Sequence, residues 1–260
     1  MKQLLDVNGK RLAIQSAGPE SGPVLVFLHH GLGAIRSWKG QIQEFCEAGY
    51  QVIAYDRWGH GNSAPRGNWS MPDFEPDLAD LEGILDQLGH RQIALIGHSD
   101  GGNIAMYYAI KHPQQVSCLV LIAAHIYIEP KMGSGIQAVK QEFESAGRFQ
   151  KQMNRVHGSK SEALFQGWFD GWSRSEIQEW DMRLVLTQIS CPALVVQGLA
   201  DEHASPQHAR DLASGIPNAQ LWLVPEAGHM LPQDNSRDFN RHLLQFLHQT
   251  LTEPAFGGDI

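Results

Sequence analysis

The sequence predicts an α/β fold, a mostly parallel central sheet flanked by helices, because short apolar runs alternate with helical patterns along the chain. The apolar runs are continuous, as in strands buried on both faces, and lie at 24–28, 52–55, 93–96, 116–123, 193–197 and 221–224. Helical patterns lie at 37–48, 76–88, 102–111, 207–214 and 237–247. Strands joined through helices run parallel, with right-handed crossovers.

The two ends of the chain have their own patterns. Residues 12–16 follow an Asn8-Gly9 turn signal, so we expect the chain to open with a β-hairpin. The tail 252–260 contains glycine and proline and is expected to be frayed.

One stretch, 125–188, breaks the alternation because it contains no convincing strand. It is rich in aromatic residues, including Trp168 and Trp172, whose spacing puts both on one face of a helix. We therefore expect a helical cap of residues 125–188 over the carboxyl-terminal edge of a core domain formed by 1–124 and 189–260. Cap aromatics such as Trp168 and Trp172 are expected to line a substrate pocket.

Composition narrows the possible environment and partners. The chain has 260 residues and a formal net charge of −8 without a basic cluster, which argues against binding to nucleic acid or to an anionic membrane surface. The three cysteines, Cys46, Cys118 and Cys191, are scattered, which argues against a disulfide framework and fits a reducing cytoplasm. We find no signal-peptide pattern at the start and no apolar run near the ~18 residues of a spanning helix. The oligomeric state stays open.

The most informative motif is Gly97-His98-Ser99-Asp100-Gly101, between a predicted strand and a predicted helix. This is the G-x-S-x-G pattern of a nucleophile elbow, a tight turn that exposes a strained serine hydroxyl. The two glycines are needed because a Cβ at either position would collide with the neighbouring strand or helix. We therefore predict that Ser99 is a nucleophile.

A serine nucleophile needs a base and an acid, which in this type of fold follow it in the order acid, then histidine. His229 lies in a loop directly after the last predicted strand, which makes it the candidate base. Asp201 follows the preceding strand, three residues past Gly198, and would hold the imidazole tautomer and stabilise the imidazolium. Glu202 is adjacent, and we expect the loop to point it away.

An oxyanion hole needs two backbone N–H groups directed at the developing negative charge. One is expected from Asp100, the residue after the nucleophile. The other should come from the loop His29-His30-Gly31-Leu32-Gly33, which follows a strand and has a second histidine where a glycine is usual. If this loop is aligned without a gap to the usual His-Gly-x-x-Gly pattern, the donor is Gly31, which we favour. An alignment shifted by one residue makes the donor Leu32.

Together these residues resemble the α/β-hydrolase superfamily over nearly the whole chain. The matching pieces are His29 to Gly33, Tyr55-Asp56-Arg57-Trp58-Gly59-His60-Gly61-Asn62-Ser63, Gly97 to Gly101, Asp201 and Gly228-His229. Within the superfamily, Gly97 to Gly102 and Cys191 to Gly198 are similar to the biphenyl-hydrolase-like (valacyclovir-hydrolase-like) group. That resemblance implies that Asp100 recognises an α-amino group on the acyl side of an ester, whereas a structural hydrogen bond is the alternative role for this carboxylate.

The expected activity is that of a serine esterase that cleaves small to medium carboxylic esters through an acyl-enzyme, with amino-acid esters as one possible class. The substrate-binding candidates are Asp100, Leu32, Trp168 and Trp172. We expect no cofactor and no metal, and a small-molecule ester as the partner. The same triad could instead hydrolyse a C–C bond, and a ligand-binding receptor with a vestigial site is the alternative outside catalysis.

Overall fold

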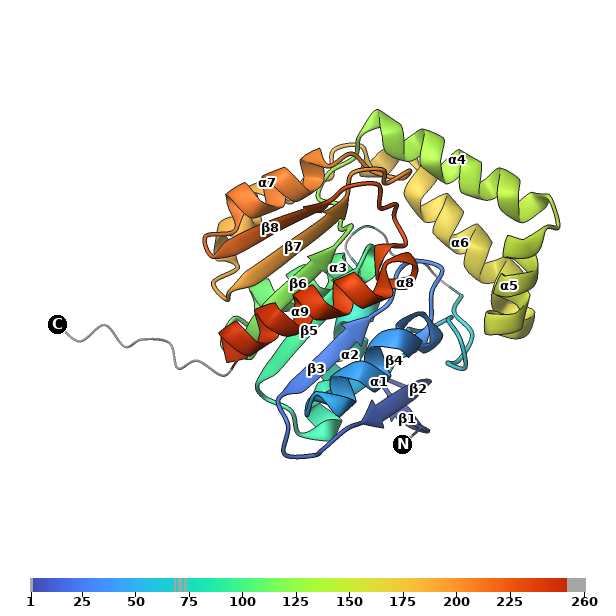
Figure 1. Ribbon diagram of the computed structural model, residues 1–260. Coiled ribbons are helices and arrows are strands. Elements are labelled where there is room, and N and C mark those ends of the chain that lie inside the picture. The colour runs from blue at the N-terminus through green and yellow to red at the C-terminus, as the bar shows by residue number, and fades with distance from the viewer. Residues whose placement is uncertain (1, 68, 70–71, 73, 252–260) are drawn as a thin grey trace.

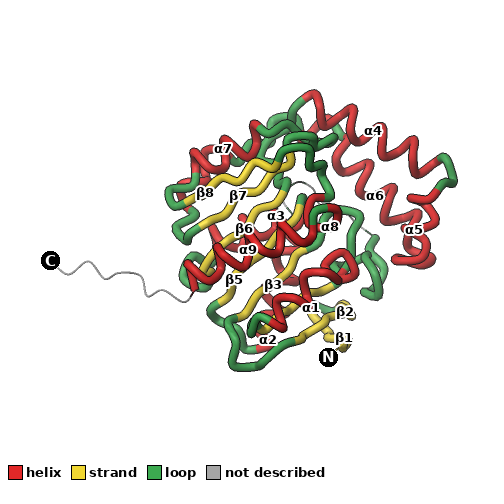
Figure 2. Tube along the Cα trace, viewed as in Figure 1, coloured by secondary structure: helices red, strands yellow, loops and turns green. Residues whose placement is uncertain are grey.

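The computed structural model describes residues 2–67, 69, 72 and 74–251, and it confirms the predicted α/β architecture (Figures 1 and 2). One eight-stranded sheet has the order β1-β2-β4-β3-β5-β6-β7-β8. The pairs β1–β2 and β2–β4 are antiparallel and the others are parallel. The strands are β1 (Lys2–Val7), β2 (Lys10–Ala17), β3 (Val24–Leu28), β4 (Gln51–Tyr55), β5 (Ile93–His98), β6 (Val116–Ile122), β7 (Ala193–Gly198) and β8 (Ala219–Val224). The tail 252–260 lies outside the described residues.

The predicted hairpin is present as β1 and β2. Its turn residues Asn8 and Gly9 both have positive φ, 50° and 74°, which suits a tight turn whose twist matches that of the strands.

Helices cover both faces of the sheet (Figure 1). On one face, α1 (Lys39–Glu47) and α9 (Ser236–Leu251) pack over the central strands. On the other lie α2 (Glu75–Leu88), α3 (Asp100–Lys111) and α7 (Gln207–Gly215). Strand β5 is buried throughout because its alternate side chains enter the two cores, Leu95 on one side and Ile96 on the other.

The prediction of a buried strand at 221–224 is wrong in part. This segment belongs to β8, the last strand of the sheet, and Leu221 is 39% exposed. An apolar run alone does not distinguish a central strand from an edge strand, because both carry apolar side chains on the face that is covered.

The helical cap lies between β6 and β7, at the upper right of Figure 1. It consists of α4 (Pro130–Glu144), α5 (Arg148–His157) and α6 (Ser161–Ser173), with the short 3₁₀ turns η2 (Gly158–Lys160), η3 (Ser175–Ile177) and η4 (Arg183–Gln188). Two further short helices, η1 (Ile35–Trp38) and α8 (Leu231–Asp234), belong to the core domain rather than to the cap. Some cap aromatics are structural, since the rings of Phe143 on α4 and Phe165 on α6 stack with centroids 3.9 Å apart.

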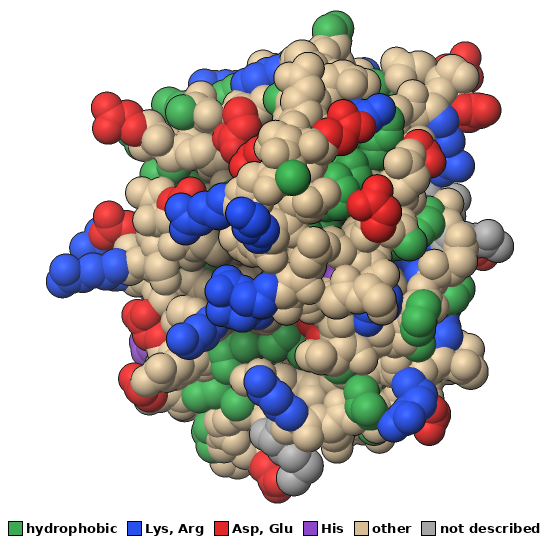
Figure 3. All heavy atoms as spheres, turned by 90° about the vertical axis from the view of Figure 1, so that its right-hand side faces the viewer, with side chains coloured by type: hydrophobic (Ala, Val, Ile, Leu, Met, Phe, Trp, Pro, Cys, Tyr) green, Lys and Arg blue, Asp and Glu red, His purple; other side chains and the backbone are tan. Residues whose placement is uncertain are grey.

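The molecular surface on the side of the cap carries charges of both signs. Figure 3 shows the face toward the cap, over which acidic and basic side chains are interspersed. In the described ranges, no helix has the length and apolar character needed to cross a membrane. All three cysteines are free thiols.

Candidate active site

The turn between β5 and α3 holds Ser99 in a strained backbone conformation, with φ 55° and ψ −122°. Such a conformation is unusual for a residue with a side chain and is concentrated at functional sites. A Cβ on Gly97 would lie 2.3 Å from the carbonyl oxygen of Gly101, and one on Gly101 would lie 2.2 Å from that of Leu28. The two glycines are therefore sterically required, as the sequence motif predicted.

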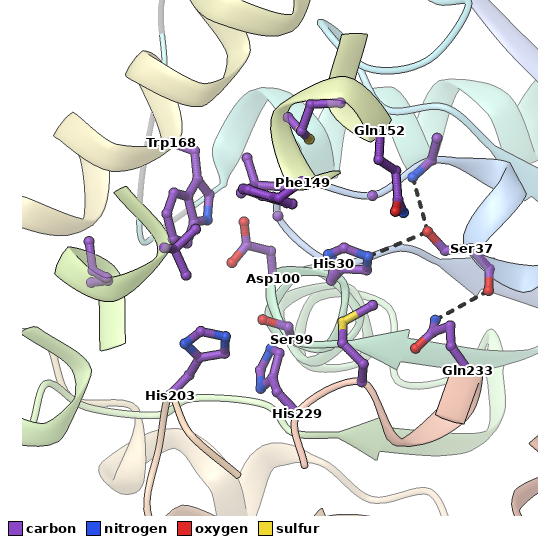
Figure 4. Close-up of a pocket in the computed structure, with 18 of the residues that line it drawn as sticks. His30, Ser37, Ser99, Asp100, Phe149, Gln152, Trp168, His203, His229 and Gln233 are labelled. Atoms are coloured by element: carbon purple, nitrogen blue, oxygen red, sulfur yellow. Dashed lines mark hydrogen bonds between the residues drawn. The ribbon is translucent and has the colours of Figure 1, made fainter. Parts of the chain in front are cut away.

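Ser99 opens into a cavity of about 440 Å³ between the sheet and the cap. Figure 4 shows its hydroxyl near the centre of the cavity, with His229 beside it and Asp100 on the other side. Ser99 is 6% exposed, and so is His229. Both side chains are thus largely shielded from bulk water while facing the same cavity.

Asp201 and His229 form the hydrogen-bonded pair expected of an acid and a base. The loops after β7 and β8 bring them together, and Oδ2 of Asp201 lies 2.9 Å from Nδ1 of His229. The other Asp201 oxygen, Oδ1, accepts hydrogen bonds from the backbone N–H groups of His203 and Ala204 at 2.8 and 3.2 Å. The carboxylate is therefore fixed in place, and it favours the His229 tautomer with a proton on Nδ1.

This pairing sets the charges at the site. Burial would raise the pKa of Asp201, but His229 and the two backbone N–H donors outweigh it and lower that pKa well below its ordinary value. Burial would lower the pKa of His229, but the carboxylates of Asp201, Glu202 and Asp100 raise it above the ordinary 6.5. Asp201 therefore stays ionised, and His229 can take up a proton near neutral pH.

The histidines around His229 have lowered rather than raised pKa values. Burial, with the nearby His229 charge adding to it, lowers the pKa of His98 to about 3 and that of His203 to about 4. Burial also lowers the pKa of His125 well below its ordinary range. Of these clustered histidines, His229 alone has a raised pKa, because it alone shares a direct hydrogen bond with a buried carboxylate.

Glu202 and His125 also belong to the site, although no role was predicted for either. The Glu202 carboxylate does not point away as expected: its Oε2 accepts the backbone N–H of His229 at 3.0 Å and so orients the histidine loop. His125, just after β6, places Nε2 3.5 Å from Ser99 Oγ. Within the described part of the chain, the Ser99 hydroxyl makes its hydrogen-bond contact with His125 rather than with His229.

The predicted oxyanion donors lie around the same cavity. Asp100 is the first residue of α3, where backbone N–H groups lack helical partners, and the helix dipole is positive. Gly31 and Leu32 both line the cavity. A Cβ on Gly31 would lie 2.4 Å from Nε1 of Trp168 and 2.7 Å from Oδ2 of Asp100, so the loop backbone packs tightly against these side chains.

The Asp100 side chain is 1% exposed and has a cationic neighbour. Its Oδ2 lies 3.5 Å from Nη2 of Arg57, which also approaches Asp77 at 3.7 Å. Burial raises the pKa of Asp100, whereas the charge of Arg57 opposes that shift. Because Arg66 also contacts Asp77, at 2.7 Å, two arginines face two aspartates in this buried cluster.

A family model described as alpha/beta hydrolase fold matches residues 23–166. The chain belongs to this family. Among the relatives of this alpha/beta hydrolase is the mouse (Mus musculus) "Serine hydrolase BPHL", 28% identical over 246 residues, covering 93% of this chain and 84% of the relative.

Two further relatives of this alpha/beta hydrolase carry other names. The Acinetobacter calcoaceticus "Bifunctional esterase/perhydrolase DCH" is 26% identical and covers 88% of this chain and 93% of its own length. The "2-hydroxy-6-oxo-6-phenylhexa-2,4-dienoate hydrolase" of Comamonas testosteroni is 26% identical and covers 88% of both chains. The predicted resemblance is confirmed, while the relatives differ in the activities that they are named for.

The cap provides much of the apolar wall of this alpha/beta hydrolase cavity. The substrate-binding candidates Leu32, Trp168 and Trp172 all line it. Further apolar side chains come from α4 and α5, namely Met132, Ile136, Val139, Phe149, Met153 and Val156. In the described residues, no group of three or more His, Cys, Asp or Glu side chains has an arrangement that could hold a metal ion.

Proposed function

We propose that this alpha/beta hydrolase is a serine esterase that cleaves small to medium carboxylic esters, with Ser99 as nucleophile, His229 as base and Asp201 as acid. One observation carries the proposal. A serine with φ 55° at the start of a helix shares a buried cavity with a histidine whose Nδ1 lies 2.9 Å from a buried carboxylate.

In acylation, Ser99 Oγ attacks the ester carbonyl carbon while Nε2 of His229 takes the hydroxyl proton. A rotation of the Ser99 side chain from His125 toward His229 brings the hydroxyl to this base. The carbonyl oxygen becomes negative and is stabilised by the N–H of Asp100 and by that of Gly31, with Leu32 as the alternative. The C–O bond then breaks, and the alcohol leaves with the proton from His229.

In deacylation, a water molecule replaces the alcohol. His229 takes one proton from the water, its oxygen attacks the acyl carbon, and a second tetrahedral intermediate forms in the same oxyanion hole. Collapse of that intermediate returns the proton to Ser99 Oγ and releases the carboxylic acid. The buried Asp201 carboxylate stabilises the imidazolium in both halves of the reaction.

The cavity supports a neutral acyl group of modest size. Its volume of about 440 Å³ and its apolar walls suit a short or branched chain, or a single ring. The Asp100 carboxylate already has Arg57 at 3.5 Å, so it does not require a substrate ammonium as a counter-ion. We therefore favour neutral esters over amino-acid esters, and a structural role for Asp100.

Location and partners are part of the same proposal. The three cysteines are free thiols and two of them are buried, which fits a reducing compartment. We therefore propose that the enzyme works in the cytoplasm, on a small-molecule ester. C–C bond hydrolysis is the second candidate, because the Comamonas relative is named for a dienoate substrate.

The test is hydrolysis of p-nitrophenyl esters of increasing acyl length, assayed beside a 2-hydroxy-6-oxo-dienoate. We expect turnover of the short esters and a loss of at least about 10³-fold in kcat for Ser99→Ala. Ser134→Ala, on the exposed side of α4, is the matched control and should equal the wild type. Exclusive turnover of the dienoate would favour the second candidate, and full ester turnover by Ser99→Ala would refute the proposal.

A further inference from the structure

Three consecutive carbonyl groups of the loop after β3 each face a histidine ring nitrogen. The contacts are His29 Nδ1 to the carbonyl oxygen of His30 at 2.8 Å, His60 Nε2 to that of Gly31 at 2.8 Å, and His157 Nε2 to that of Leu32 at 3.2 Å. His29 and His60 belong to the core, whereas His157 is the last residue of the cap helix α5. The cap thus contacts the backbone of the predicted oxyanion loop directly.

The backbone determines which ring nitrogen of His157 carries the proton. The N–H of Gly61 lies 2.9 Å from His157 Nδ1, and because an amide N–H can only donate, Nδ1 must accept. The proton of the neutral imidazole is then on Nε2 and is donated to the Leu32 carbonyl. Burial holds His157 neutral by lowering its pKa to about 4. The side chain is 3% exposed, so this bridge is shielded from water.

A second cap residue reinforces the same contact. Lys160, in η2, donates through Nζ to the carbonyl oxygen of Gly61 at 2.7 Å. It also approaches the carbonyl oxygen of His60 at 3.5 Å. The chain between α5 and η2 therefore contacts the loop that carries His60. His157, at the end of α5, also contacts the oxyanion loop through the Leu32 carbonyl.

Resting on the proposed function, we propose that His157 is a positioning residue through which the cap fixes the oxyanion loop in its catalytic orientation. In a peptide group the C=O and N–H point in opposite directions, so a held carbonyl also directs the N–H. The carbonyls of His30 and Gly31 share peptide groups with the N–H of Gly31 and Leu32, the two candidate donors. The Leu32 carbonyl shares its peptide group with the N–H of Gly33, which donates to the carbonyl of His30 at 3.0 Å and closes the turn.

The expected effect is smaller than that of deleting an oxyanion donor. Removal of one such donor costs about 10²–10³-fold in kcat. His157 holds one of three carbonyls and acts on the donors through the turn, so we expect its loss to lower kcat by about 10- to 100-fold. KM should change little, because the oxyanion forms only after the substrate has bound.

The experiment compares His157→Phe, His157→Met and His157→Gln in the full-length enzyme. Phe and Met replace the imidazole by an apolar side chain of roughly similar size and remove both hydrogen bonds; two such variants are made in case one fails to fold. Gln can accept from Gly61 with its oxygen and donate to Leu32 with its nitrogen. His90→Phe, in the turn before β5 at the opposite end of the sheet, is the matched control.

We expect lower kcat with KM within about twofold for Phe and Met, and recovery of most of the loss by Gln. Binding of a trifluoromethyl ketone, which forms a tetrahedral oxyanion on the serine, should weaken in parallel with kcat/KM. Unchanged kcat in folded Phe and Met variants, or a loss that Gln does not recover, would overturn the role of His157 alone. A wild-type protein that neither hydrolyses esters nor reacts with a fluorophosphonate would overturn the proposed function as well.

Discussion

Substitution of Asp201 by asparagine should inactivate the enzyme through the tautomer of His229. The carboxylate accepts two backbone N–H groups at Oδ1, from His203 and Ala204, and at Oδ2 it accepts Gln197 Nε2 at 2.7 Å and His229 Nδ1 at 2.9 Å. Backbone N–H groups cannot become acceptors, so the asparagine oxygen must stay at the Oδ1 position. The new amide NH₂ group must then take the place of Oδ2.

At that place the NH₂ group faces His229 Nδ1 and donates to it, while the Gln197 amide can turn to present its oxygen. The imidazole must then carry its proton on Nε2, so it cannot accept the proton of Ser99. In a Ser-His-Asp triad this change lowers kcat by about 10⁴-fold, or about 5.4 kcal/mol at 1.36 kcal/mol per factor of ten. KM should be nearly unchanged, because Asp201 is buried behind His229.

The assay is kcat and KM for a short p-nitrophenyl ester at pH 8, with the thermal midpoint measured in parallel. Asp238→Asn makes the same chemical change at an exposed ion pair on α9 and should behave as the wild type. A folded Asp201→Asn enzyme that keeps more than a tenth of the wild-type kcat would show that the His229 tautomer does not depend on Asp201.

Three further predictions concern pH, charge and backbone geometry. Because protonated His229 cannot accept a proton and its pKa is raised, kcat/KM should fall as the pH drops through a midpoint above 6.5; a flat profile from pH 5 to 9 would contradict this. α-Amino-acid esters should not outperform equal-sized des-amino esters, and a preference of about 5- to 150-fold that Asp100→Asn abolishes would show ammonium binding instead. Gly101→Ala should destabilise the fold by about 3 kcal/mol in urea unfolding, because its Cβ would lie 2.2 Å from the Leu28 carbonyl oxygen, whereas Gly133→Ala, with open space around it, should not. Equal stability of these two alanine variants would contradict the steric argument.

Most of the fold could be predicted because its signals are local. Five of the six predicted strands are buried in the sheet, and helices were expected within a few residues of α1, α2, α3, α7 and α9. The sixth, now β8, was misjudged because burial of an edge strand depends on the sheet order, which no local pattern contains.

The candidate triad could also be proposed from the sequence, because the loops that follow parallel strands lie at the same edge of the sheet. Ser99, Asp201 and His229 each follow a strand, and the structure brings all three to one end of it. Whether Gly31 or Leu32 supplies the second N–H stays a prediction, since both line the cavity.

Other features of the site depend on contacts between distant segments. His157 lies 125 positions from the Leu32 carbonyl that it contacts, and its position at the end of a cap helix gave no local signal. No role was predicted for His125, because it follows a strand without a motif. Arg57 lies in the quoted Tyr55 to Ser63 segment, but its contact with Asp100 joins two separate segments and could not be predicted from either one. The histidine-rich composition, 13 in 260 residues, was the available hint that several of them surround the site.

The role of Ser99 as the nucleophile is tested most directly by mapping the covalent adduct of a fluorophosphonate by peptide mass spectrometry. We expect about one equivalent of label per chain, all of it on Ser99, and no label on Ser99→Ala. Labelling should be slower at pH values below the pKa of His229, because the base must be neutral to activate the hydroxyl. An adduct on another residue, or undiminished labelling of Ser99→Ala, would contradict the claim.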